Sequence, residues 1–215
     1  MKEKPILFSG PMVRAILEGR KTQTRRVIKP QPDLSILKES ARGLEFEFRR
    51  MPALGPTHTP AEWGFVPKYD KPDCMPIFGY SCPWKVGMKL WVRETFRIPE
   101  YHEYDDRVEV EYRANHPTPD ELKWKPSIFM PRKFSRITLE ITGVRAERLN
   151  DISEMDAMAE GCKSELSRKQ DLISGRWCDV LSYKKGFESI WDSINGKSYP
   201  WSSCPWVWVI EFKII

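Results

Sequence analysis

The sequence lacks the features that mark membrane, secreted or disulfide-stabilised proteins. It has no run of about eighteen apolar residues, the length that a membrane-spanning helix needs. Residues 1–5 lack the apolar core of a secretion signal. The chain has only 5 cysteines, none in a C-x-x-C arrangement. Scattered cysteines in odd number indicate neither a disulfide framework nor a zinc ribbon. We therefore expect a cytoplasmic protein with reduced thiols and no membrane partner.

A metal centre and a polycationic arm are also not indicated. Cys74 and Cys82 with His58 or His102 form the one conceivable zinc set, but their seven-residue spacer is unlike that of a zinc knuckle. We predict no metal and no cofactor. With 35 Lys and Arg against 30 Asp and Glu, the net charge of +5 describes a mixed surface. Tight non-specific binding to duplex nucleic acid is therefore not implied.

Half of the 18 prolines lie between Lys29 and Lys85. Proline removes a backbone donor, so this density excludes long helices and central strands there. A chain of 215 residues is long enough for one domain with insertions. We predict a single domain over 1–215, with an irregular proline-rich insertion at about 33–85.

Outside the insertion, the periodicity predicts strands and helices. β-Branched and aromatic residues alternate or run together over 90–96, 108–112, 136–141 and 206–212, which is typical of strands. One helix should begin at Ser153, with Asp156 three residues on, and end at Gly161. Another should carry Phe187 and Trp191 and end before Asn195-Gly196. Short strands, few helices and the absence of βαβ order favour an α+β fold with a mixed barrel.

The segment 19–26, Gly-Arg-Lys-Thr-Gln-Thr-Arg-Arg, is the most informative part of the chain. Val13, Ile16 and Leu17 share one face of a helix that should end at Gly19. The segment after it contains only cationic and uncharged residues, which indicates a site for an anionic or nucleotide-like ligand. The neighbouring cations favour the neutral form of Lys21, so that it can act as a base.

Glu94 is a second candidate. Alternation over 90–96 places its carboxylate on the same face as Leu90 and Val92. An unpaired buried carboxylate is costly, so Glu94 should meet a cation, for which Lys21 or Arg26 is the natural partner. The alternative is that Glu94 forms a structural ion pair, or that the two faces are reversed.

The pattern Gly19-x-Lys21-x-x-Thr24-x-Arg26 resembles the G-x-K-x-x-E-x-R signature of ASCH domains, which are relatives of the PUA RNA-binding fold. Threonine stands where the broad signature has glutamate, a departure shared with bacterial N4-acetylcytidine amidohydrolases. The rest of the chain, except about 33–85, is similar to longer ASCH-like proteins of phages and prophages. Segments 5–9, 91–95, 130–132 and 201–208 carry that similarity.

The resemblance implies a PUA-like (ASCH) mixed β-barrel with flanking helices, in a bacterial or phage-infected cell. It also implies an amidohydrolase acting on N4-acylated cytidine or a related nucleoside or nucleobase, with Lys21, Thr24 and Glu94 as the catalytic set. Thr24 would be the nucleophile, Lys21 its base, and Glu94 would orient the lysine or relay the proton. Backbone N–H groups after Gly19, or Arg26, would meet the oxyanion.

Two other functions stay open. The same cationic cluster can bind RNA or a nucleotide without chemistry, since phosphate contacts position nucleic acids in this way. A ribonuclease is a third hypothesis, because that activity is ascribed to at least one ASCH group. For whichever ligand applies, the residues predicted to bind it are Arg20, Arg25, Arg26, Met130 and Arg132.

Overall fold

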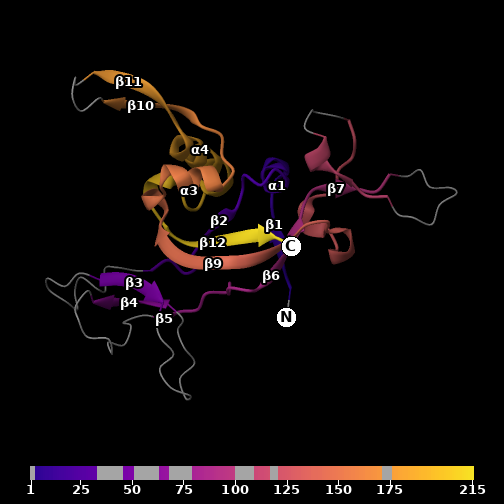
Figure 1. Ribbon diagram of the computed structural model, residues 1–215, viewed down its shortest axis with the longest axis horizontal. Helices are drawn as coiled ribbons and strands as arrows, with labels where there is room; N and C mark the ends of the chain where they lie inside the picture. Colours follow the sequence, from indigo (N-terminus) through magenta and orange to yellow (C-terminus); the bar gives the residue numbers. More distant parts are fainter. Residues whose placement is uncertain are drawn as a thin grey trace, which may run out of the picture.

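The computed structural model describes residues 3–32, 46–50, 63–67, 79–99, 109–116, 121–170 and 176–215. Much of the predicted insertion at about 33–85 lies outside these ranges, as do His58, Cys74 and His102 of the zinc set. The elements are numbered along the chain in Figure 1.

A five-stranded mixed sheet forms the centre of the fold (Figure 1). Its strands, in spatial order, are β1 (Lys4–Leu7), β6 (Lys89–Arg93), β9 (Thr138–Arg148), β12 (Trp206–Ile214) and β2 (Gln23–Val27). β1 pairs with β6 in parallel, and the other neighbours are antiparallel. The α+β class is confirmed. Among the described residues, the pairings run from β1 to β2 without closing a barrel, so the PUA-like barrel stays a prediction.

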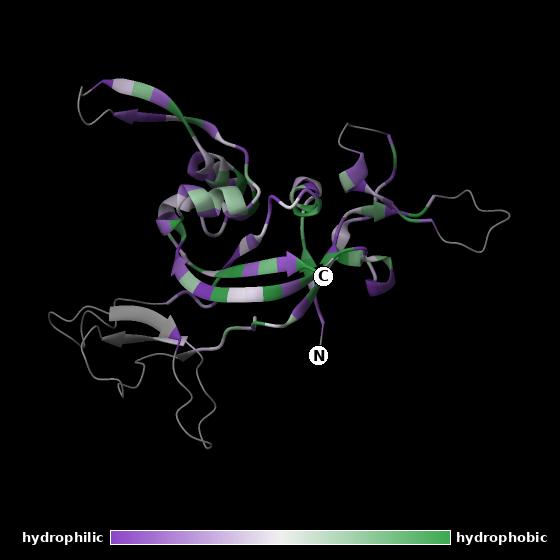
Figure 2. Cartoon of the chain, in the orientation of Figure 1, coloured by the Kyte–Doolittle hydropathy of each residue, from purple (hydrophilic) through white to green (hydrophobic). Residues whose placement is uncertain are grey.

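β12 is buried on both of its faces, which explains its nearly continuous apolar sequence (Figure 2). Trp208, Ile210 and Phe212 belong to a core cluster that also includes residues of α1. Val207 and Val209 belong to a second cluster with residues of α3 and α4. Since β12 contributes to both clusters, it links the two halves of the core and fixes the position of its edge neighbour β2.

The three α-helices among the described residues match their sequence signals. α1 (Gly10–Leu17) ends where Gly19 takes φ 72°, a left-handed conformation that glycine adopts without strain. α3 (Glu154–Ala159) begins at Ser153, whose hydroxyl accepts a hydrogen bond from the Asp156 N–H. α4 (Tyr183–Asn195) buries Phe187 and Trp191. None of the helices in the described ranges has the length and apolarity that crossing a membrane requires.

Short elements connect these parts. The 3₁₀ helices are η1 (Arg113–Asn115), η2 (Ser127–Phe129), η3 (Arg132–Phe134), η4 (Leu149–Asp151) and η5 (Trp201–Ser203). β7 (Phe96–Arg97) and β8 (Glu111–Tyr112) form a two-stranded pair. The predicted strand over 108–112 is therefore paired only at its end, and residue 108 lies outside the described ranges.

Three described segments of the insertion form strands. β3 (Phe46–Arg50), β4 (Trp63–Pro67) and β5 (Gly79–Tyr80) form a separate antiparallel sheet. Trp63 is buried against Trp208 of β12, with ring centroids 5.3 Å apart. Proline therefore did not exclude strands here, because Pro67, the one proline of this sheet, stands at the last residue of β4.

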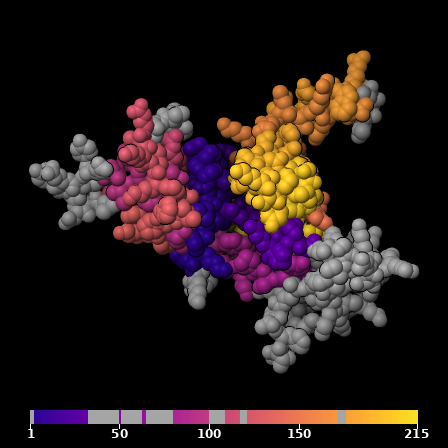
Figure 3. Space-filling view, turned by 180° about the vertical axis from the view of Figure 1, so that it is seen from behind, coloured from indigo at the N-terminus to yellow at the C-terminus, as the bar shows by residue number. Residues whose placement is uncertain are grey.

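A two-stranded arm had no counterpart in the sequence analysis. β10 (Glu165–Gln170) and β11 (Trp177–Ser182) pair antiparallel and extend away from α3 and α4 (Figures 1 and 3). Leu166 and Leu181 are opposite each other and both are exposed. The arm has no buried face, so it lacks the alternation of apolar and polar residues by which strands are predicted.

Candidate functional site

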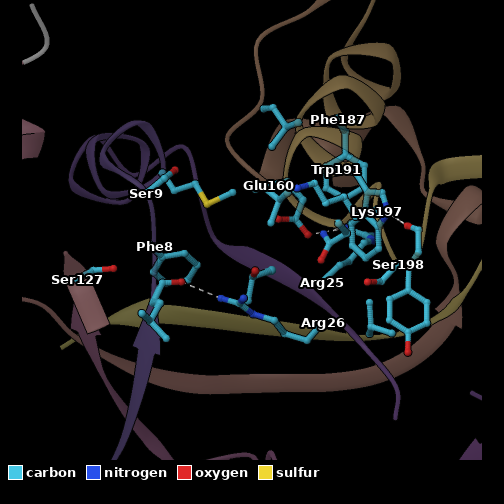
Figure 4. Close-up of a pocket in the computed structure, with 18 of the residues that line it drawn as sticks. Phe8, Ser9, Arg25, Arg26, Ser127, Glu160, Phe187, Trp191, Lys197 and Ser198 are labelled. Carbon is cyan, nitrogen blue, oxygen red and sulfur yellow. Dashed lines mark hydrogen bonds and ion pairs between the residues drawn. The ribbon is translucent and has the colours of Figure 1, made fainter. Parts of the chain in front are cut away.

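A pocket of about 700 Å³ lies between α1 and α4, over β2 (Figure 4). Thr24, Arg25 and Arg26 of β2 form part of its wall. Phe187 and Trp191 of α4 line it from one side, and Phe8, Ser9 and Met12 line it from the other. Its volume is that of a small-molecule site, about 300–1,000 Å³. The basic segment and an aromatic wall thus meet around one cavity.

The turn after α1 directs β2 toward α3. The N–H groups of Arg20 and Lys21 both donate to the Ala15 carbonyl, and the Thr22 N–H donates to Ala159 at the end of α3. Lys21 and Glu160 also form an isolated β-bridge. These contacts join α3 to the basic segment. They also occupy the N–H groups after Gly19, so the predicted backbone oxyanion hole does not form there.

Lys21 is fully enclosed, with 0% of its side chain exposed. Its ammonium group donates to the Gln23 carbonyl at 2.9 Å, to the Glu160 carbonyl at 2.9 Å and to Glu160 Oε2 at 2.7 Å. All three donors of the ammonium group are therefore used. In this arrangement Lys21 has no free lone pair, so it can act as a base only after it passes a proton to a neighbour.

Glu160 is the carboxylate that accompanies Lys21. Its Oε2 accepts from Lys21, and its Oε1 accepts from Arg25 Nη1 at 3.0 Å. The Glu160 side chain is only 4% exposed, yet it lines the pocket. Sequence analysis missed this residue. The available signal was its position beside Gly161, at the end of the helix predicted from Ser153.

Arg25 is held by three carboxylates and is itself 0% exposed at its side chain. It contacts Glu147 Oε1 at 2.6 Å and Asp156 Oδ2 at 3.5 Å, in addition to Glu160. Arg25 lines the pocket, as expected of a binding residue. Its guanidinium group is nevertheless committed to the protein, so its main effect is to hold Glu160 in place.

An outer layer of polar contacts supports this network. The Gln23 amide donates to Asp156 Oδ1 at 2.9 Å, and Arg145 contacts the same oxygen at 3.1 Å. Burial opposes the charged form of Asp156, but the Gln23 hydrogen bond and the charges of Arg145 and Arg25 outweigh it, and the pKa of Asp156 lies below its ordinary value. Asp156 therefore stays ionised at neutral pH and helps to balance Arg25.

Thr24 and Arg26 offer groups to a ligand. Among the described residues, no side-chain hydrogen bond engages the Thr24 hydroxyl, and Thr24 lines the pocket. Arg26 Nη2 donates to the Leu7 carbonyl at 2.9 Å, and its guanidinium group lies over the Phe8 ring at 5.6 Å (Figure 4). Burial lowers the pKa of Arg26, with the Glu160 charge acting in the opposite direction. Arg26 remains charged, because an arginine does not deprotonate in proteins.

The predicted partnership of Glu94 with Lys21 or Arg26 is wrong. β6 ends at Arg93, and the Glu94 carboxylate accepts from Arg136 Nε at 2.8 Å and Nη2 at 2.9 Å. Thr95, not Glu94, lines the pocket. The structural ion pair that the sequence left as the alternative is therefore present. The strand stops one residue before Glu94, so its alternation does not define where that carboxylate points.

Three other predicted binding residues do not line this pocket. Arg20 is bonded to Glu18 and to the Gly161 carbonyl on the surface. Met130 is 0% exposed, and its sulfur accepts from the Glu94 N–H at 3.2 Å. Arg132 donates to Glu3 at 2.7 Å. Each of the three therefore has a partner outside this pocket.

No metal centre is evident in the described part of the chain, where no three His, Cys, Asp or Glu side chains are grouped to hold an ion. Neither protein-family models, nor curated proteins, nor solved structures gave a match to this chain, so a functional assignment depends on the geometry of the site.

Proposed function

We propose that the chain is an amidohydrolase acting on N4-acylated cytidine or a related modified nucleoside or nucleobase. One observation carries the proposal: Thr24 and Glu160 line the same pocket, and the Glu160 carboxylate is bonded to the fully buried Lys21. The ASCH resemblance supplies the substrate class and the PUA-like barrel, and both belong to the proposal. Glu160 takes the place that the sequence gave to Glu94.

The cost of the buried charges supports a functional role. Lys21, Arg25 and Glu160 have side chains that are at most 4% exposed. Buried ion pairs are often no more stabilising than apolar residues of the same volume, because desolvation offsets their attraction. Charged clusters of this kind that border a cavity are typical of active sites. Apolar residues would fill this position at lower cost if it had only a structural role.

Glu160 is the group that exchanges protons with the ligand. Lys21 holds its protons in three hydrogen bonds, whereas the Glu160 carboxylate borders the pocket. Lys21 and Glu160 therefore act as one pair, in which Glu160 exchanges a proton with the ligand and Lys21 compensates through their 2.7 Å contact. Arg25 keeps the carboxylate oriented.

The reaction then has two stages. The Thr24 oxygen attacks the acyl carbon, its proton goes to Glu160, and the oxyanion that forms is stabilised by Arg26. The bond from the acyl carbon to N4 breaks, and N4 takes the proton to leave as an amine. Water next attacks the threonine ester, releases the carboxylic acid and returns a proton to Thr24. Phe8, Phe187 and Trp191 offer aromatic surfaces to the base.

A non-catalytic RNA- or nucleotide-binding module is the second candidate. The cations Arg26, Lys29 and Lys197 line the pocket, which favours phosphate recognition whether or not chemistry follows. Gel-shift titration with RNA at low salt tests this function, and cleavage of a labelled oligoribonucleotide in the same samples tests the ribonuclease hypothesis. Protein that binds RNA but hydrolyses no acylated nucleoside would replace our first proposal with this one.

The direct test is ultraviolet-monitored deacylation over a panel of N4-acyl cytosines, cytidines and deoxycytidines. Thr24→Val removes the hydroxyl at nearly constant volume and should reduce kcat/KM about 10²–10⁴-fold. Thr24→Ser keeps a hydroxyl and should retain a large part of the activity. Unfolding curves of both variants control for stability. Wild-type protein that is inactive over the whole panel would overturn the amidohydrolase assignment.

A further inference from the structure

The pocket combines a charge-balanced end with a cationic end. At the balanced end, Lys21 and Arg25 contact Glu160, and Arg25 also contacts Glu147 and Asp156. At the other end, no carboxylate contacts Arg26, Lys29 or Lys197 among the described residues, and all three line the pocket. The excess of positive charge on the cavity wall therefore comes from Arg26, Lys29 and Lys197.

The cationic end is built from ordered contacts. The N–H groups of Ser198 and Tyr199 donate to the Asn195 carbonyl, and the Trp191 indole donates to the Tyr199 carbonyl at 2.8 Å. A Cβ at Gly196 would lie 2.4 Å from the Asp192 carbonyl oxygen, so this turn requires glycine. Lys197 therefore projects from a fixed turn, next to Ser198 in Figure 4.

Lys29 is linked to the same turn. It follows β2 by two residues, and its ammonium group lies 5.7 Å from the centroid of the Tyr199 ring. Lys29 and Lys197 come from distant parts of the sequence, and both line the pocket together with Tyr199. Arg26 precedes Lys29 by three residues and also lines the pocket, as does Thr24.

We infer that this end of the pocket binds the phosphate group of a nucleotide, so that the substrate is a phosphorylated nucleoside and not the free nucleoside. The inference rests on the proposed function, because the base and its acyl group must occupy the end near Thr24 and Glu160. Lys29 and Lys197 supply the contacts to this phosphate, because lysine ammonium groups bind phosphate as point charges. The phosphate can belong to a free mononucleotide or to a phosphodiester of a strand.

Calorimetric titration of the whole chain with cytidine monophosphate and with cytidine tests the inference without any reaction. We expect the monophosphate to bind about tenfold more tightly at low salt, and inorganic phosphate to compete with it, because charge pairing at an exposed site is screened by salt. An oligocytidylate without a terminal phosphate distinguishes the two sources. Tighter binding of this oligomer than of the monophosphate assigns the phosphate to a strand.

Lys29→Gln and Lys197→Gln should each weaken monophosphate binding about two- to fivefold, as for exposed ion pairs, and leave cytidine binding unchanged. Lys123→Gln is the matched control, since Lys123 is exposed and does not line the pocket. If the oligomer is the tighter ligand, the same two variants should weaken its binding. Equal affinity for cytidine and both phosphorylated ligands, or wild-type affinity in both variants, would overturn the phosphate site.

The two proposals fail in different ways. Phosphate-dependent binding without hydrolysis of any acylated ligand supports the phosphate site and removes the amidohydrolase. Hydrolysis of N4-acetylcytidine with equal binding of cytidine and its monophosphate supports the amidohydrolase and removes the phosphate site. If no ligand binds at all, the phosphate site is overturned.

Discussion

Glu160 and Glu94 are two buried carboxylates with different surroundings. Glu94 is the more deeply buried, with a side chain 1% exposed against 4% for Glu160. Its two oxygens are taken by one guanidinium group, that of Arg136, which also lies 4.0 Å from the Tyr112 ring centroid. Glu160 is instead shared between Lys21 and Arg25 and borders the pocket.

The comparison teaches that burial does not by itself identify a functional carboxylate. Glu94 is closed off by a bidentate pair, an arrangement in which arginine and carboxylate satisfy each other. Glu160 has a proton donor on one oxygen and access to a ligand, which are the requirements for general acid–base chemistry. The predictions below test this difference.

The largest expected effect separates the two glutamates by activity. Glu160→Gln should lower kcat/KM for N4-acyl cytidines about 10²–10⁴-fold, because the amide cannot exchange the proton. Glu94→Gln should leave kcat/KM within about threefold of wild type, since no reacting group contacts it. Initial rates measured on folded protein provide the test. Comparable losses in the two variants would remove the distinction.

The second prediction separates them by stability. Arg136→Met leaves the Glu94 carboxylate buried without its cation, which should lower the free energy of unfolding by about 3–5 kcal/mol. The activity per folded molecule should not change, because Arg136 does not line the pocket. Urea unfolding and rate measurements on the same samples check both parts. A stable variant with reduced kcat/KM would contradict the structural role of the pair.

The third prediction concerns acid pH and the network around Glu160. The pKa of Asp156 is lower in the folded chain than its ordinary value of 3.8. Its contribution to stability is therefore present above that value and is lost as the pH falls through the lower, folded pKa. Asp156→Asn should lower the unfolding midpoint at neutral pH and reduce its dependence on pH below about 4. Thermal unfolding at a series of pH values measures this, with Glu94→Gln for comparison.

The smallest effect uses Cys162 as a reporter near Glu160. Burial, followed by the Glu160 charge, raises the pKa of Cys162 to about 12, so its thiol should react slowly with iodoacetamide at neutral pH. Exposed Cys178 should react much faster. Glu160→Gln should increase the Cys162 rate a few-fold, whereas Glu94→Gln should not. Peptide mass spectrometry over time follows both sites, and fast labelling of Cys162 in wild type would contradict its burial.

Local signals in the sequence were sufficient for several elements. The end of α1 at Gly19 and the start of α3 at Ser153 were predicted correctly, because both depend on contacts within a few residues. The apolar run over 206–212 also predicted β12 correctly, because a continuous run of β-branched and aromatic residues is a local signal of a buried strand. The β10–β11 arm was missed, since its residues are exposed and carry no pattern of burial.

The candidate site was predicted in part. The motif placed Thr24, Arg25 and Arg26 at a pocket, and it identified Lys21 as part of the same segment. The expected contact of Glu94 with Lys21 or Arg26 was wrong, because alternation was extended beyond the end of β6 at Arg93, and Lys21 contacts Glu160 instead. Lys197 was not selected, since it follows a helix far along the chain and nothing local relates it to the basic segment.

The sequence by itself determined the end of α1, the start of α3 and the place where cations gather along the chain, because these depend on backbone sterics and on neighbouring residues. Only the tertiary structure decided which carboxylate meets Lys21. That contact joins residues 139 positions apart and depends on the bonds of Lys21 and Thr22 to the end of α3. This pairing results from the packing of α3 and α4 against β12. That packing is the sum of many weak apolar contacts, so no single residue in the sequence reveals it.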